Sequence, residues 1–160
     1  IQRYCNEIFR CRMPYHDLRK GRFSQSGHAY HLTTVTHGRE PFFADWQTAC
    51  KVVQTMRDLI CADRVESLAW VLMPDHLHWL FILHGDSIAD IAKQLKGRSA
   101  LAINQHLARS GAVWQPNYHD HALRRDEDLR KTARYIVANP LRRGLVSDIG
   151  QYPLWDAVWL

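Results

Sequence analysis

Two histidines with one residue between them stand in the run M-P-D-H-L-H-W-L-F-I-L, residues 73–83. If this run is a buried strand, His76 and His78 point to the same face, because side chains alternate along a strand. A pair of imidazoles so placed can hold one divalent cation. The alternative is a pair of structural histidines, since a buried imidazole needs hydrogen-bond partners. A second pair with this spacing, His119 and His121, flanks a charged residue.

A tyrosine and an amide lie together on the last helix that the periodicity predicts, which begins at Asp126 and ends by Asn139-Pro140. The apolar stripe of this helix consists of Leu129, Ala133, Ile136 and Val137. Tyr135 lies off the stripe, and Asn139 follows one turn later on the same face. A deprotonated phenol can attack phosphorus, and an amide oxygen can join imidazoles around Mg²⁺ or Mn²⁺. The alternative for Tyr135 is an ordinary side chain at the polar edge of a surface helix.

Basic residues are concentrated in two parts of the chain. The 160 residues carry a formal net charge of +5, and their 46% hydrophobic content is typical of a globular domain. Residues 1–22 hold six Lys or Arg against two Asp or Glu, and residues 91–145 hold eleven against four. A polyanion, most commonly nucleic acid, is the natural partner for this distribution, and a solvated basic surface is the alternative.

The elements that must position these residues follow the order β-α-β-β-α-β-α. The predicted strands are 28–36, 66–73, 76–84 and 118–124, and the predicted helices are 45–62, 87–110 (capped by Asp86 or Ser87) and 126–139. This order predicts an α+β fold, a ferredoxin-like split β-α-β antiparallel sheet with an extra C-terminal helix carrying Tyr135. The strand of His76 and His78 is then central, and its large apolar side chains face two helices while the histidines face the other side.

Cysteine usage and hydropathy indicate a cytoplasmic protein without a membrane partner. Cys5, Cys11, Cys50 and Cys61 form no C-x-x-C pair, and we interpret them as reduced thiols. No apolar stretch reaches the roughly 18–20 residues that a membrane span requires. Met13 is a candidate native start, which would make residues 1–12 an upstream extension.

Several stretches resemble one family of DNA-processing enzymes. H-L-H after M-P-D matches the His-hydrophobic-His (HUH) motif of single-strand DNA nucleases, and R-Y-I-V-A-N-P-L-R-R-G-L-V (134–146) resembles the tyrosine motif of single-tyrosine transposases. The run L-R-K-G-R-F-S-Q-S-G-H-A-Y-H-L-T-T-V-T, the W-Q-P at 114–116 and the D-H-A-L-R at 120–124 look like the REP-associated tyrosine transposases. The match extends from Leu18 to Trp155.

This resemblance implies a metal-dependent single-stranded DNA endonuclease and strand transferase of the HUH fold. It would act on hairpin DNA of repetitive extragenic palindromes through a covalent 5′-phosphotyrosine intermediate. His76, His78 and Asn139 would be the ligands of Mg²⁺ or Mn²⁺, and Tyr135 would be the nucleophile. Some relatives carry another residue at the position of Asn139.

The expected partner is single-stranded or hairpin DNA, and the chain would act as a monomer or a homodimer. Three parts are predicted: a basic arm (1–27), a catalytic domain (28–145) and a C-terminal tail (146–160). The candidate DNA-binding residues are Arg19, Lys20, Arg22, Lys93, Lys96, Arg98, Arg124, Arg125, Arg130, Lys131, Arg134, Arg142 and Arg143. His121 is a candidate neighbour of the site, and a hydrogen-bonding role in the sheet is its alternative.

Two other functions compete with this interpretation. A ferredoxin-like protein can bind single-stranded or hairpin DNA without catalysis, through stacking and charge. A zinc hydrolase could use His76, His78 and a third ligand to activate water, although no H-E-x-x-H spacing supports it. Only the transposase interpretation requires Tyr135 for a covalent product.

Overall fold

The computed structural model describes residues 27–123 and 128–159, so the predicted basic arm and the predicted contacts of Arg19, Lys20, Arg22, Arg124 and Arg125 lie outside the described residues. The strands are β1 (Ala29–Val35), β2 (Val65–Met73), β3 (His76–Leu83), β4 (His119–Ala122) and β5 (Trp155–Ala157). The α-helices are α2 (Trp46–Cys61), α3 (Ile88–His106), α4 (Leu129–Val137) and α5 (Asn139–Arg142). Short 3₁₀ turns are η1 (His37–Arg39), η2 (Phe42–Ala44) and η3 (Ile149–Gln151).

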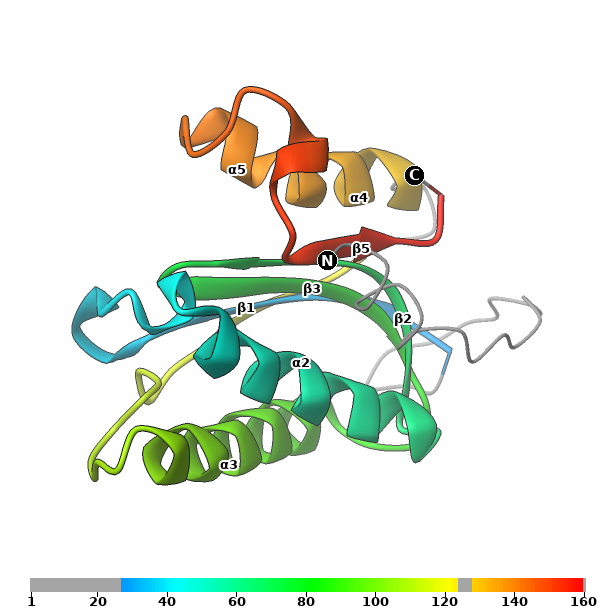
Figure 1. Ribbon diagram of the computed structural model, residues 1–160. Helices are drawn as coiled ribbons and strands as arrows, with labels where there is room; N and C mark the ends of the chain where they lie inside the picture. Colours follow the sequence, from blue (N-terminus) through cyan, green and yellow to red (C-terminus); the bar gives the residue numbers. More distant parts are fainter. Residues whose placement is uncertain (1–26, 124–127, 160) are drawn as a thin grey trace.

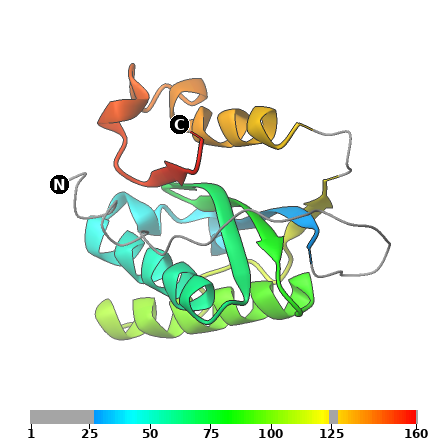
Figure 2. The same ribbon diagram turned by 90° about the vertical axis from the view of Figure 1, so that its right-hand side faces the viewer.

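The five strands form one antiparallel sheet in the order β4-β1-β3-β2-β5. The predicted α+β, ferredoxin-like split β-α-β fold is confirmed, with β3 in the centre. In Figures 1 and 2, α2 and α3 cover one face of the sheet, and α4 and α5 lie on the other. The sheet therefore separates two helical layers.

Strand β3 has one wholly apolar face and one face that begins with the two histidines. The apolar side chains Leu77, Trp79, Phe81 and Leu83 are completely buried, and they pack toward α2 and α3. Because strand residues alternate, His76 and His78 face the side of α4. The alternation seen in the sequence therefore determines which layer the histidines meet.

Helices α2 and α3 begin at side-chain caps. Asp45 accepts a hydrogen bond from the Thr48 amide at the start of α2, and Ser87 accepts one from the Asp90 amide at the start of α3. Of the two predicted caps for α3, Ser87 is therefore the one used. The helix ends at His106, earlier than predicted.

Helix α4 is short and strongly amphipathic. Asp128 caps it by accepting from the amides of Arg130 and Lys131. Ala133 and Ile136 are buried against the sheet, as the stripe predicted. The predicted stop before Pro140 is confirmed, since α4 ends at Val137 and the proline lies in the first turn of the separate helix α5.

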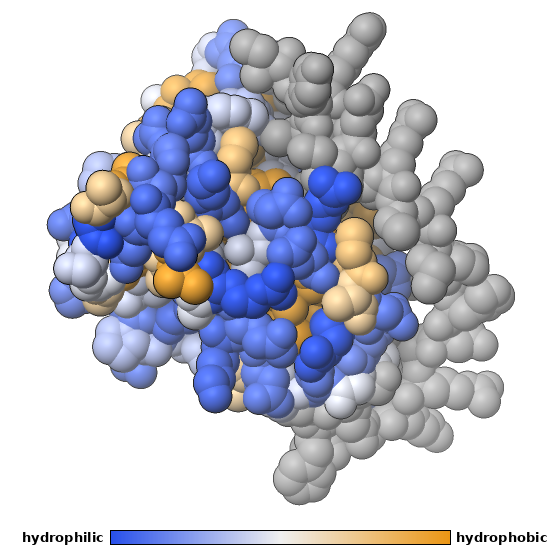
Figure 3. All heavy atoms as spheres, turned by 60° about the horizontal axis from the view of Figure 1, so that its bottom comes forward, coloured by the Kyte–Doolittle hydropathy of each residue, from blue (hydrophilic) through white to orange (hydrophobic). Residues whose placement is uncertain are grey.

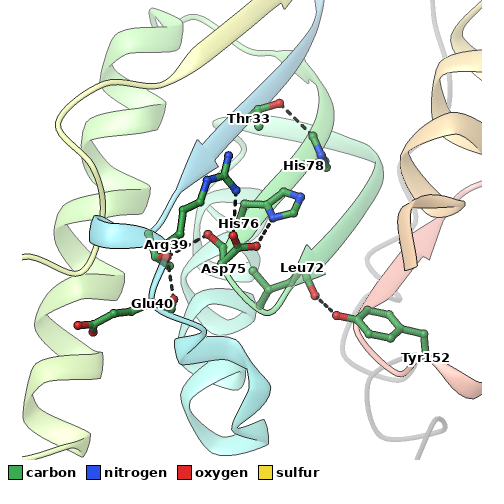
Figure 4. Close-up of polar contacts among 9 residues, drawn as sticks. Thr33, Arg39, Glu40, Leu72, Asp75, His76, His78 and Tyr152 are labelled. Carbon is green, nitrogen blue, oxygen red and sulfur yellow. Dashed lines mark hydrogen bonds and ion pairs between the residues drawn. The ribbon is translucent and has the colours of Figure 1, made fainter. Parts of the chain in front are cut away.

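The C-terminal tail adds β5, a strand that the sequence analysis did not predict, to the edge of β2. The tail is thus docked on the core, with Leu154 and Ala157 buried. Tyr152, which precedes β5, donates its hydroxyl hydrogen to the Leu72 carbonyl at 2.7 Å (Figure 4). Burial and the nearby Asp75 carboxylate raise the pKa of Tyr152 to about 12.

We expect Tyr152→Phe to lower the free energy of unfolding by about 1 kcal/mol near neutral pH, because one buried hydrogen bond is lost. The unfolded phenol ionises near pH 10 and the folded one near pH 12. The wild-type protein therefore loses up to about 1.4 kcal/mol per pH unit between these values, and the variant does not share this loss. Urea unfolding near neutral pH and near pH 11 should show that the difference in unfolding free energy between the two proteins closes at the higher pH. An unchanged difference would contradict the prediction.

Within residues 27–123 and 128–159, none of the helices has the length and apolarity needed to cross a membrane.

Candidate functional site

His76 lies at the start of β3 and is buried, with only 6% of its surface exposed. Its Nδ1 is 2.5 Å from Oδ1 of the preceding residue, Asp75. The other oxygen of this carboxylate accepts a hydrogen bond from Arg39 at 2.9 Å (Figure 4). Burial opposes ionisation of Asp75, but the hydrogen bonds from His76 and Arg39 outweigh it and lower the pKa of the carboxyl. The imidazole of His76 is thus held by an ionised group.

The ring of His78 lies beside that of His76, with centroids 5.0 Å apart and the planes nearly perpendicular. Its Nδ1 is 3.0 Å from the Thr33 hydroxyl oxygen and 3.1 Å from Nε2 of His31, both on the neighbouring strand β1. Burial lowers the pKa of His78 to about 3, helped by repulsion from His76, His31 and Arg143. His78 is therefore neutral at physiological pH.

Further histidines continue this face of the sheet beyond His78. His31 on β1 is directly opposite His121 on β4 in the strand register. Burial and the proximity of His121 lower the pKa of His31. His121 thus neighbours the site through His31, and the rival pair on β4 lies at the exposed edge of the sheet.

The tyrosine predicted as the nucleophile lies on the layer that the histidines face. Tyr135 on α4 is 50% exposed, in agreement with its position off the apolar stripe. The guanidinium carbon of Arg142 lies 4.2 Å from the centre of its ring. An exposed phenol under a cation is accessible to an anionic substrate.

The helical spacing predicted Asn139 on the same face as the exposed Tyr135. The structure differs, because Asn139 is 91% buried. Its amide nitrogen donates to the carbonyls of Tyr135 at 3.1 Å and Ile136 at 2.8 Å. The helix ends before Asn139, and the side chain turns back to satisfy the last carbonyl groups of α4. This arrangement uses the nitrogen and leaves Oδ1 as the atom that could bind a cation.

The histidines, the tyrosine and the asparagine come from separate elements. Among the described residues, no hydrogen bond joins Tyr135 to His76 or His78, and no group of three His, Cys, Asp or Glu could hold a metal ion. The effect of Arg143 on His78 shows that the end of α5 is within electrostatic range of the pair. A cation at the histidines would therefore need further ligands other than His, Cys, Asp or Glu of the described residues, such as an amide oxygen.

The candidate DNA-binding residues divide between the two layers. Arg130, Lys131, Arg134, Arg142 and Arg143 are exposed on the layer of Tyr135. Lys93, Lys96 and Arg98 lie on α3, across the sheet, so the candidate residues do not form one surface around the tyrosine helix. Figure 3 views the side of α2 and α3, which is largely hydrophilic.

Two of the α3 cations are engaged in interactions within the chain. The Lys96 ammonium donates to the carbonyls of Gln115 at 2.6 Å and Pro116 at 2.8 Å, and burial lowers its pKa. Arg98 pairs with Asp58 of α2 at 2.7 Å. Lys96 therefore holds the loop before β4, and Arg98 joins the two helices.

Three residues that contact the histidines were missed as candidates, namely Thr33, His31 and Asp75, as was Arg39, which contacts Asp75. The adjacency of Asp75 to the H-L-H run was visible in the sequence. Thr33 opposes His78 in the pairing of β1 with β3, which only the register reveals. Arg39 reaches Asp75 from the 3₁₀ turn η1, which comes after β1.

Comparisons with known proteins agree with this architecture. The family model described as "Transposase IS200 like" matches residues 24–139. The REP-associated tyrosine transposase of Escherichia coli (strain K12) is 29% identical over 87 residues, covering 53% of this chain and 50% of that protein. A relative from Haemophilus influenzae is 28% identical over 99 residues, which cover 55% of this chain and 56% of that protein. The chain spans about half the length of the curated relatives it matches.

One solved structure is that of a REP-associated tyrosine transposase bound to a REP hairpin. The two folds superpose with a TM-score of 0.66 and 24% sequence identity, over 86% of this chain and 81% of the other. The likeness therefore concerns the fold. Because the family match includes the histidine pair, Tyr135 and Asn139 and covers most of the sequence, the chain belongs to the IS200-like transposase family.

Proposed function

We propose that this protein is a metal-dependent single-stranded DNA endonuclease and strand transferase that acts on hairpin DNA of repetitive extragenic palindromes. The observation that carries the proposal is the position of Tyr135. Its side chain is half exposed on the layer faced by the histidine pair, within a chain of the IS200-like transposase family.

The proposed donor atoms could hold a divalent cation and leave coordination positions open. His76 and His78 would bind it through imidazole nitrogen, and Asn139 through its amide oxygen, which suits Mg²⁺ or Mn²⁺. The low pKa of His78 keeps its lone pair free of protons at neutral pH. A bound cation would polarise the scissile phosphodiester and offset its growing negative charge.

Tyr135 would make the covalent link to DNA. Its deprotonated oxygen attacks phosphorus and forms the tyrosyl O–P bond, while the bond from phosphorus to the 3′-oxygen breaks. The departing 3′-oxygen takes up a proton and becomes a free hydroxyl. Attack of a 3′-hydroxyl on the phosphotyrosine reverses these steps, so strands can be rejoined without ATP.

Exposed cations on the same layer would hold the DNA backbone. Arg134 directly precedes Tyr135 in sequence, and Arg142 lies over its ring. Guanidinium groups form paired hydrogen bonds with phosphate. A hairpin substrate is supported by the solved relative with a REP hairpin and similar fold.

The test uses a pool of hairpin oligonucleotides with randomised single-stranded flanks and a label at the 3′ end. A 5′-phosphotyrosine joins the protein to the 3′ fragment, so this label should appear at the size of the protein on a denaturing gel with Mn²⁺. A fully paired duplex is the control and should give little product. Binding without a covalent band would instead support a non-catalytic DNA-binding protein, and cleavage without attached label would support a hydrolase.

A further inference from the structure

Each of the two predicted histidine ligands has its Nδ1 engaged by a neighbour. His76 uses Nδ1 toward the Asp75 carboxylate, and His78 uses Nδ1 toward Thr33 and His31. No hydrogen bond between two described residues involves Nε2 of either ring. Nε2 is therefore the nitrogen without such a bond on both rings, although the partners of the two Nδ1 atoms come from different elements.

The hydrogen-bond chemistry at His76 determines where its proton lies. A carboxylate can only accept, so Nδ1 of His76 carries the hydrogen when it bonds Asp75. A neutral imidazole has one N–H, and Nε2 then keeps its lone pair. The pairing thus selects the form of the ring that can bind a cation through Nε2.

Asp75 is itself held from several directions. Arg39 donates to its second carboxylate oxygen at 2.9 Å, and its backbone carbonyl accepts from the Thr36 amide at 2.9 Å and the Thr36 hydroxyl at 3.0 Å. Figure 4 shows the hydrogen bonds that link Arg39 to Asp75 and Asp75 to His76. The carboxylate therefore has little freedom to leave the imidazole.

His78 Nδ1 has two neighbours that are able to accept its proton. The hydroxyl oxygen of Thr33 and Nε2 of His31 both lie within hydrogen-bond distance of its Nδ1, at 3.0 Å and 3.1 Å. Thr33 opposes His78 in the register of β1 and β3. The pairing of β1 with β3 thus gives His78 a hydroxyl partner at Nδ1, as the preceding residue gives His76 a carboxylate partner at Nδ1.

We infer that Asp75 and Thr33 are positioning residues that hold His76 and His78 with the proton on Nδ1, so that both rings offer Nε2 to the cation. This inference rests on the proposed function, because that function supplies the need for a cation. Neither residue touches the reacting atoms. Partners of this type commonly contribute 10- to 100-fold to metal affinity.

Calorimetric titration of the full chain with Mn²⁺ gives the first test. We expect Thr33→Val and Asp75→Ala each to weaken Mn²⁺ binding by about 10- to 100-fold. Thr33→Ser, which keeps the hydroxyl, should bind as the wild type does. The matched control is Asp63→Ala, which removes a similar carboxylate, 3.0 Å from Nδ1 of His84 beyond the other end of β3, and should leave the affinity unchanged.

Long-range ¹H–¹⁵N spectra of the metal-free protein give the second test, with rings assigned by His76→Gln and His78→Gln. We expect both rings with the proton on Nδ1, and loss of this preference at His78 in Thr33→Val. A wild-type ring with the proton on Nε2, or unchanged Mn²⁺ affinity in both Thr33→Val and Asp75→Ala, would overturn the inference. A wild-type chain with the expected tautomers that binds no Mn²⁺ would contradict the metal role in the proposed function while supporting the hydrogen-bond assignment.

Discussion

Tyr135→Phe should reduce the labelled protein–DNA adduct by about 10³-fold or more, to the background of the assay. The variant lacks the only atom of this side chain that can bond phosphorus. It keeps the aromatic ring beneath Arg142. Because the side chain is half exposed, the free energy of unfolding should change by no more than about 0.5 kcal/mol.

Two controls separate loss of the nucleophile from other effects. Tyr152→Phe removes a phenol hydroxyl from the tail at the β2 edge and should leave the adduct at the wild-type level. Fluorescence anisotropy should show that Tyr135→Phe binds the hairpin with unchanged affinity. A covalent band that persists in Tyr135→Phe would assign the nucleophile to another residue and end this part of the proposal.

His78→Ala should lower Mn²⁺-dependent adduct formation by about 10²-fold or more, a loss of at least about 2.7 kcal/mol of transition-state stabilisation. The variant removes one of the two proposed imidazole ligands. It also leaves the Thr33 hydroxyl without this partner on β3. Adduct formation should be measured over a range of Mn²⁺ concentrations, because a lost ligand shifts the concentration needed as well as the rate.

The matched control for this variant is His84→Ala. His84 follows β3 on the same alternation, but it pairs with Asp63 far along the strand from His76. We expect His84→Ala to form the adduct with the wild-type dependence on Mn²⁺. Full activity of His78→Ala without added metal would show that the histidine pair is structural, which was the alternative interpretation of the H-L-H run.

Local periodicity in the sequence was enough to predict most elements and the exposure of Tyr135. Alternation along residues 76–84 separated the histidines from the apolar side chains that are now buried under α2 and α3. The stripe of α4 placed Tyr135 outside the core. These features depend on about ten consecutive residues, and burying apolar surface enforces each of them without reference to distant parts of the chain.

Other features could be decided only by the tertiary structure. The hydroxyl of Thr33 reaches His78 because β1 and β3 pair in one register, and a shift by one residue would turn it to the other face. Helix packing puts Lys93 across the sheet from Tyr135, and the break after Val137 buries Asn139. Local sequence is thus enough to identify the chemical groups and the face that each occupies on its own element. Which groups meet depends on strand register, layer order and helix breaks, because these result from contacts between residues far apart in the chain.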